Sequence, residues 1–156
     1  MKTYSVEELQ AILAKHKLWW AGQAGGIRAD LSGAVLRSAV LRSADLSGAV
    51  LRSAVLSGAD LSGAVLRSAV LRSADGSDLV LADQNALLQI GPIGSRRDIL
   101  IAWKEKGGAV YLQTGCFFGS IADFEAAITK THGDNLHAVE YRAAIACIRM
   151  LRCQSP

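Results

Sequence analysis

Residues 29–73 read ADLSG AVLRS AVLRS ADLSG AVLRS AVLSG ADLSG AVLRS AVLRS, which is nine five-residue units without a gap. Each unit begins with Ala, places Asp or Val second and Leu third, and ends in Ser-Gly or Arg-Ser. A tenth unit, ADGSD at residues 74–78, has Gly76 where Leu belongs. An internal repeat constrains the architecture more than any other sequence signal, so this segment determines the fold.

A period of five excludes the ordinary secondary structures. An α-helix advances about 100° per residue, so leucines five apart spread around it and form no apolar stripe. In a flat strand an odd spacing sends successive leucines to opposite faces. If the chain turns a corner after each unit, every Ala and Leu can face one axis. Four corners then close a square coil of about 20 residues, and coils stacked about 4.8 Å apart satisfy one another's backbone groups.

The units resemble the pentapeptide repeat, whose pattern is a small residue, Asp or Asn, Leu or Phe, a polar residue and often Gly. The resemblance covers residues 29–73, and the invariant Leu disfavours a low-complexity linker. It implies a right-handed quadrilateral β-helix with the central Leu and Ala inside. The predicted core leucines are Leu31, Leu36, Leu41, Leu46, Leu51, Leu56, Leu61, Leu66 and Leu71.

The second position of the unit departs from the family, because Val stands there six times in place of Asp or Asn. With about 20 residues per coil, valines stack in pairs on two sides of it. One interpretation is an apolar, Arg-edged interaction surface. The alternative is that β-branched residues simply favour strands. The residues of the predicted surface are Val35, Val50, Val55, Val70, Arg52 and Arg72.

The segment before the repeat predicts a helix that caps the coil. Ser5 and Glu8 form a capping box that opens a helix over about residues 6–20, and glycines after residue 21 end it. We expect its Trp and Leu face to cover the first coil, since open strand edges must be covered. His16 on this helix is predicted to be solvated. Similar helices precede the repeat in many phage and bacterial relatives of the family.

After residue 78 the period is lost, and the sequence predicts a small α+β module. Strands are expected at 87–90, 98–103 and 109–113, with a short strand or turn at 115–119, then helices to about residues 131 and 152. The chain thus divides into a capping segment (1–28), a β-helix (29–78) and a β-meander with two helices (79–156). The segments GPIGSRRD, TGCFFGS and THGDNLHAVEYRAAI resemble a module that accompanies pentapeptide repeats in phage and bacterial proteins.

Three clusters in this module are candidates for chemistry. Cys116 with His132 or His137 suggests a thiol nucleophile and a base, although a buried structural cysteine is the favoured interpretation. The segment from His132 to His137 offers imidazole and carboxylate ligands, but the chain has no CxxC or HExxH spacing. A helix–helix turn explains this segment, so no metal or cofactor is predicted. The turn with Gly91, Gly94, Arg96 and Arg97 is the best candidate for binding an anion, against a plain turn with solvated arginines.

Composition narrows the function. The 156 residues are 51% hydrophobic and 20% charged with a net charge of +3, which excludes a disordered chain and makes nucleic acid an unexpected partner. Three late cysteines indicate a reducing cytoplasm, and no apolar run reaches the roughly 18 residues of a membrane span. These features favour a non-enzymatic protein-binding module, with a homodimer or a phage-encoded inhibitor of a host protein as candidate forms. The alternatives are a DNA mimic acting on gyrase, disfavoured by the arginines of the repeat, and a small enzyme in the C-terminal module.

Overall fold

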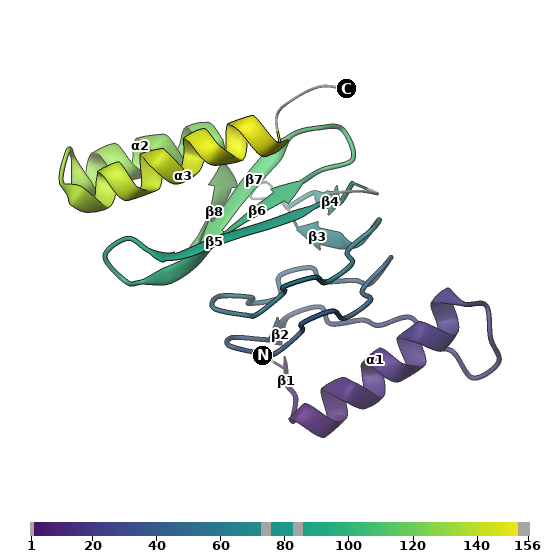
Figure 1. Cartoon of the computed structure of the whole chain (residues 1–156). Coiled ribbons are helices and arrows are strands. Elements are labelled where there is room, and N and C mark those ends of the chain that lie inside the picture. The colour runs from purple at the N-terminus through teal and green to yellow at the C-terminus, as the bar shows by residue number, and fades with distance from the viewer. Residues whose placement is uncertain (1, 73–75, 83–85, 153–156) are drawn as a thin grey trace.

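The computed structural model describes residues 2–72, 76–82 and 86–152, with only the backbone of Arg72 and Arg152. Figure 1 shows the layers: helix α1 at one end, the stacked coils, a four-stranded sheet, and helices α2 and α3 at the other end. The elements in chain order are β1 (Lys2–Thr3), α1 (Val6–Trp20), β2 (Ala34–Val35), β3 (Val70–Arg72), β4 (Asp78–Val80), β5 (Leu87–Ile93), β6 (Asp98–Lys104), β7 (Val110–Thr114), β8 (Phe117–Ser120), α2 (Ile121–His132) and α3 (Leu136–Arg152).

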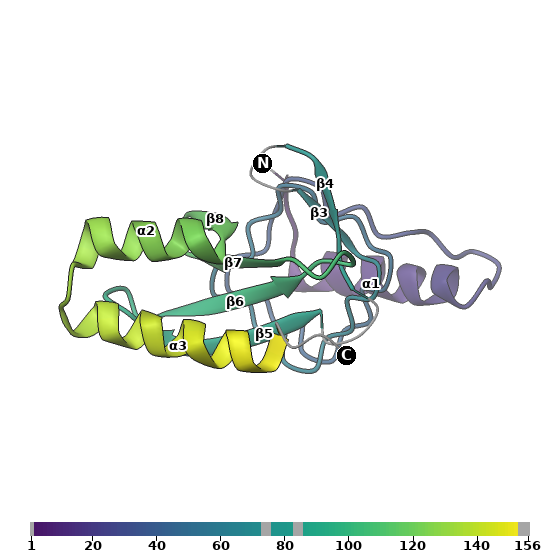
Figure 2. The same ribbon diagram turned by 90° about the horizontal axis from the view of Figure 1, so that it is seen from above.

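The repeat forms coils of 20 residues, as the period predicts. Parallel bridges join Asp30 to Val50, Val35 to Val55, Val40 to Asp60, Asp45 to Val65 and Val50 to Val70. Around each bridge the backbones exchange two hydrogen bonds; the Leu31 N–H donates to the Val50 carbonyl at 2.8 Å, and the Val50 N–H to the Ala29 carbonyl at 2.9 Å. Figure 2, seen along the stack, shows the coils lying over one another. The right hand and the square section stay predictions.

Each unit ends in a tight turn that requires a positive φ. The Ala34 N–H donates to the Leu31 carbonyl at 3.0 Å, and the same bond recurs at the following units. A type II turn needs φ above zero at its third residue, which favours Gly. Four corners carry Gly at this point, at residues 33, 48, 58 and 63, and four carry Ser, at residues 38, 43, 53 and 68 with φ near +54 to +57°.

The nine predicted leucines all form the core of the coil. Each of them is at most 5% exposed, and five of the alanines that begin the units are also buried. Both ends of this core are closed by other segments, because Leu9 of α1 and Trp103 of β6 belong to the same buried cluster.

Helix α1 begins with the predicted capping box at Ser5 and Glu8, but its contact with the coil differs from the expectation. Leu9 and His16 are its buried residues, whereas Trp19 and Trp20 remain 36% and 44% exposed. The prediction of a solvated His16 is wrong. Its Nδ1 accepts the Ala29 N–H at 3.1 Å. Later units give this N–H a Leu carbonyl, and the first unit has no Leu three residues earlier.

The C-terminal sheet has the order β5-β6-β7-β8 and is antiparallel throughout. Alternate residues of β6 serve two cores: Ile101 and Trp103 join the core of the coil, and Leu100 and Ala102 join the core beneath α2 and α3. The sheet therefore caps the coil with one face and carries the helices on the other.

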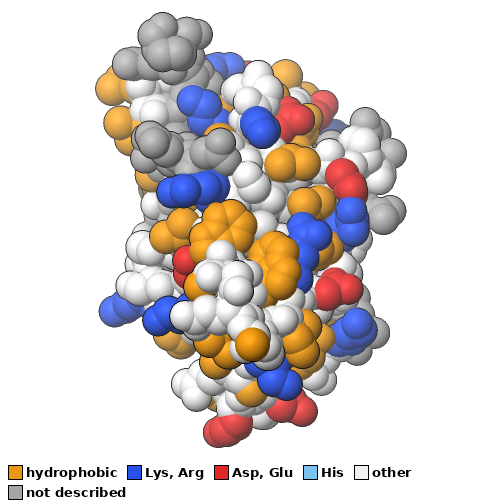
Figure 3. Space-filling model, turned by 90° about the vertical axis from the view of Figure 1, so that its right-hand side faces the viewer, with side chains coloured by type: hydrophobic (Ala, Val, Ile, Leu, Met, Phe, Trp, Pro, Cys, Tyr) orange, Lys and Arg blue, Asp and Glu red, His pale blue; other side chains and the backbone are white. Residues whose placement is uncertain are grey.

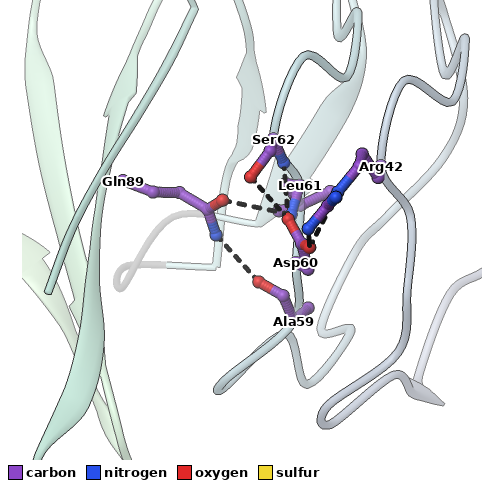
Figure 4. Close-up of polar contacts among 6 residues, drawn as sticks. All are labelled: Arg42, Ala59, Asp60, Leu61, Ser62 and Gln89. Carbon is purple, nitrogen blue, oxygen red and sulfur yellow. Dashed lines mark hydrogen bonds and ion pairs between the residues drawn. The ribbon is translucent and has the colours of Figure 1, made fainter. Parts of the chain in front are cut away.

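The side-chain amide of Gln89 in β5 joins the sheet to the coil by taking the place of a backbone peptide group. This amide donates to the Ala59 carbonyl at 2.8 Å and accepts the Leu61 N–H at 3.1 Å (Figure 4). These are the two bonds that the next coil would make at this position, as Asp60 makes them to Ala39 and Leu41. The last backbone carbonyl and N–H of this ladder of the coil therefore both have hydrogen-bond partners.

Candidate binding cleft

The valines of the predicted surface are less exposed than their pattern suggests. Val50 is only 8% exposed, because it lies in the middle of the Asp30–Val50–Val70 stack. Val35, Val55 and Val70 are half-buried. The most exposed valines of the repeat are Val40 (77%) and Val65 (44%), on the two other sides. The apolar patch predicted around Val50 is therefore not present as such.

The arginine edge of that surface is also partly neutralised. Arg52 forms an ion pair with Asp78 of β4, the strand that turns back over β3. The side chain of Arg72 lies outside the described residues. On another side of the coil, Arg42 contacts Asp60 at 2.8 Å (Figure 4). Hydrogen bonds from the Ser62 hydroxyl and N–H, together with Arg42, lower the pKa of Asp60 to about 2.

The side of the coil that carries Val55 borders a cleft of about 580 Å³. Its opposite wall is the turn between β7 and β8 with the adjoining strand residues. Both apolar and charged side chains line it, and two of them are arginines from opposite walls. The residues are Arg37, Ser38, Ala54, Val55, Ser57, Gly58, Arg96, Asp98, Gln113, Gly115, Cys116, Phe117 and Phe118.

Gly115 fixes the shape of this cleft. Its carbonyl accepts the Ser57 hydroxyl of the coil at 2.7 Å, and its N–H donates to Asp98 of β6 at 3.1 Å. It has a φ of +54°, and a Cβ here would come within 3.1 Å of the Arg96 guanidinium. The positive φ favours glycine at this position, and the turn holds the sheet against the coil.

The carboxylate of the cleft has hydrogen-bond partners, whereas its two arginines have no ion-pair partner among the described residues. Asp98 accepts two backbone N–H groups, from Ile99 at 2.8 Å and from Gly115. Arg37 and Arg96 are exposed, and no carboxylate in the described part of the chain lies within ion-pair distance of either. The cleft thus presents two unpaired guanidinium groups beside apolar side chains.

A second pocket of about 240 Å³ lies on the other side of the same turn, and Cys116, His132 and Tyr141 all line it. The structure thus brings Cys116 and His132 to one pocket, with no hydrogen bond between them among the described contacts. His137 instead lies 3.5 Å from Glu140. Cys116 is exposed, so the favoured prediction of a buried cysteine is wrong; it sits at the tip of a two-residue turn. Burial raises the pKa of Tyr141.

The predicted anion site holds a carboxylate of the protein itself. The Gly94 N–H donates to Glu140 of α3 at 2.9 Å, and Arg97 lies 3.7 Å from the same side chain. The Gly94 hydrogen bond is the main cause of the lowered pKa of Glu140. Gly91 is not among the contacts of this carboxylate, and Arg96 lines the cleft instead. The described residues include no cluster of three metal-ligating side chains.

The end of α1 carries a separate apolar surface, which includes the two tryptophans that were expected to cover the first coil. Leu18, Trp19, Trp20 and Ile27 are 36–58% exposed, and Figure 3 shows hydrophobic side chains gathered on this face. Arg28 lies over the Trp19 ring at 5.5 Å. No described helix is both long and apolar enough to cross a bilayer.

Comparison with known proteins bears on the repeat. A family model described as pentapeptide repeats matches residues 29–67 and 44–79, with eight copies. The searches of curated proteins and of solved structures found no match. The matched residues include the stacked coils. They do not include the β7–β8 turn, which forms the second wall of the cleft. Residues 29–79 of the chain therefore belong to the pentapeptide-repeat family.

Proposed function

We propose that this chain is a non-catalytic protein-binding module that receives its partner on the side of the coil carrying Val35 and Val55. The observation that carries the proposal is the cleft of about 580 Å³ between this side and the β7–β8 turn. Ligand sites are concave and combine apolar walls with a few placed polar groups. Val55 and Phe118 supply apolar wall here, and Arg37 and Arg96 supply charge.

Both walls of the cleft are held by the fold, which favours binding without rearrangement. The coil wall is part of a backbone ladder in which the Val55 N–H donates to the Ala34 carbonyl at 2.9 Å. The sheet wall is tied to the coil through Ser57 and Gly115. A preformed site loses less entropy on binding, so more of the contact energy contributes to affinity.

Two candidate partners fit this module. A second copy of the chain is the simplest, because one self-complementary patch is enough for a symmetric dimer. A host protein bound by a phage-encoded inhibitor is the other. Mimicry of DNA is less well supported, since Asp60 and Asp78 are paired with Arg42 and Arg52 and form no acidic column.

Site-specific photocrosslinking tests the proposal. A photoreactive residue at position 55 is expected to capture a discrete protein band in cells of the source organism. The same residue at position 40, where Val is 77% exposed on another side of the coil, is the matched control. Sedimentation of the purified chain then separates a second copy from a different protein. Equal capture from both positions, or none from position 55, would contradict the proposal.

A further inference from the structure

We propose that the cleft takes an extended acidic peptide segment of the partner, held through Arg37, Arg96 and the free edge of β8. The inference rests on the proposed function and names the chemistry that the cleft would recognise.

Two arginines and one carboxylate, Asp98, give the cleft a net positive charge, which favours a ligand with carboxylates. Arg37 comes from the fourth position of a repeat unit, and Arg96 from the loop between β5 and β6, so the two guanidinium groups enter from opposite walls. Neither has an acidic partner in the part of the chain that the structure describes. The neighbouring Arg97, in contrast, is already paired with Glu140. Guanidinium groups bind carboxylates with two hydrogen bonds, and this geometry suits Asp or Glu side chains.

The backbone of β8 favours a peptide over another polyanion. β8 is the edge strand of its sheet. The Ser120 N–H donates to Asp123 and hence points away from β7. Backbone groups alternate in direction along an antiparallel strand, so Phe118, two residues earlier, also turns its N–H and carbonyl outward. Phe118 lines the cleft, and an extended peptide can pair with an edge of this kind.

The apolar wall fits the second face of such a peptide. Side chains of an extended strand alternate between two faces. A peptide that turns its carboxylates toward the arginines presents every other residue to the wall, where Ala54, Val55 and Phe117 are half-buried. A nucleic acid would not use the outward N–H and carbonyl of Phe118 in this way.

A random dodecapeptide library displayed on phage tests the inference with the full-length chain. We expect the selected peptides to be enriched in Asp and Glu, and a synthetic peptide of the leading sequence to bind in fluorescence anisotropy. Arg37→Glu with Arg96→Glu should weaken this binding at least tenfold, and Arg37→Gln with Arg96→Gln less strongly. Arg67→Glu is the matched control, because Arg67 holds the same repeat position, is exposed and lines a different pocket.

The backbone part of the inference has its own readout. Two variants of the peptide are compared, with N-methyl groups on its odd-numbered or on its even-numbered backbone nitrogens. Only one of the two sets faces β8, so one variant should lose binding and the other should keep it. Failure to select any peptide, selection of peptides without acidic enrichment, or equal binding to the Arg37 and Arg96 variants would overturn the inference. Tighter, Arg37-dependent binding of single-stranded oligothymidylate would also overturn it. If any of these results is obtained while a photoreactive residue at position 55 still captures a protein, the acidic-peptide inference is wrong and the proposed function is retained. Loss of that capture would instead contradict the proposed function.

Discussion

Single residues at the corners of the coil hold conformations that their side chains disfavour. Ser53 is exposed and has a φ of +57°, a region that costs a residue with a Cβ about 1 kcal/mol or more. We expect Ser53→Gly to stabilise the protein by about 0.5 kcal/mol, because the relief exceeds the added entropy of the unfolded chain. Ser32→Gly is the control, since Ser32 has no positive φ and the change should destabilise. Midpoints of chemical denaturation compare the two, and equal shifts would contradict the explanation.

The buried His16 makes stability depend on pH. Its Nδ1 accepts the Ala29 N–H, so the ring is neutral, and its Nε2 has no hydrogen-bond partner among the described residues. Burial is the main cause of its lowered pKa; Arg28 adds to the effect, and Asp45 and the Ser47 backbone oppose it. As the pH is lowered below about 6.5, the unfolded chain is protonated at His16 before the folded protein is. The free energy of unfolding therefore decreases as the pH decreases below this value.

The expected measurement is a series of melting temperatures between pH 5 and 8. The wild-type protein should lose stability below about pH 6.5, whereas His16→Gln, which keeps an acceptor but does not titrate, should lose less over the same range. Parallel curves for the two proteins would show that another group is responsible.

At the scale of elements, the N-terminal segment closes one open end of the coil in two ways. β1 pairs in parallel with β2, and α1 packs Leu9 into the core of the coil. Deleting residues 1–22 should expose this edge and cause aggregation, because an unpaired strand edge pairs with other chains. Light scattering measures the outcome.

Two point variants in α1 separate the cap from chain length. Leu9→Glu, at a residue that is 8% exposed, should weaken the cap, and Val6→Glu, at 67% exposed, should not. A truncated protein that stays monomeric with an unchanged melting temperature would show that the coil needs no cover at this end.

The sequence predicts these elements well where a local pattern specifies them. Ser5 forms the capping box that begins α1 at the predicted residue, and the five-residue period places the nine core leucines of the repeat. The burial of His16 and the exposure of Trp19 and Trp20 were missed. Both depend on how α1 is rotated against the first coil, and the broad apolar face of this helix does not specify that rotation.

At the scale of the whole molecule, Gln89 is one of the side chains that join the coil to the sheet. Replacing Gln89 with Met keeps its length but removes the bonds to Ala59 and Leu61, and leaves a backbone donor and acceptor without partners. We expect a loss of about 1–3 kcal/mol. Gln10→Met on the exposed face of α1 is the control and should change stability by less than about 0.5 kcal/mol. Equal denaturation midpoints for the two variants would contradict the role of Gln89.

The cleft is the part of the molecule that sequence reasoning could not reach. Val55 and Gly115 are far apart in the chain, and they line one cleft only because the sheet is docked on the coil through Ser57 and Gln89. No local sequence pattern at either residue predicts this arrangement. The carboxylate beside Gly94 in the predicted anion site could not be foreseen for a related reason, because it comes from Glu140, 46 residues later.

The amide of Gln89 also has a consequence for how such proteins can grow. It makes the two bonds that a further coil would make at this position, so this contact of the docked module does not depend on how many coils precede it. Duplicating four units would lift the sheet by one strand spacing, about 4.8 Å, and keep its orientation. Adding a single unit would instead carry Gln89 to the neighbouring side and turn the sheet by one quarter of a coil. The number of repeat units thus sets both the distance and the orientation of the C-terminal module relative to the N-terminal helix.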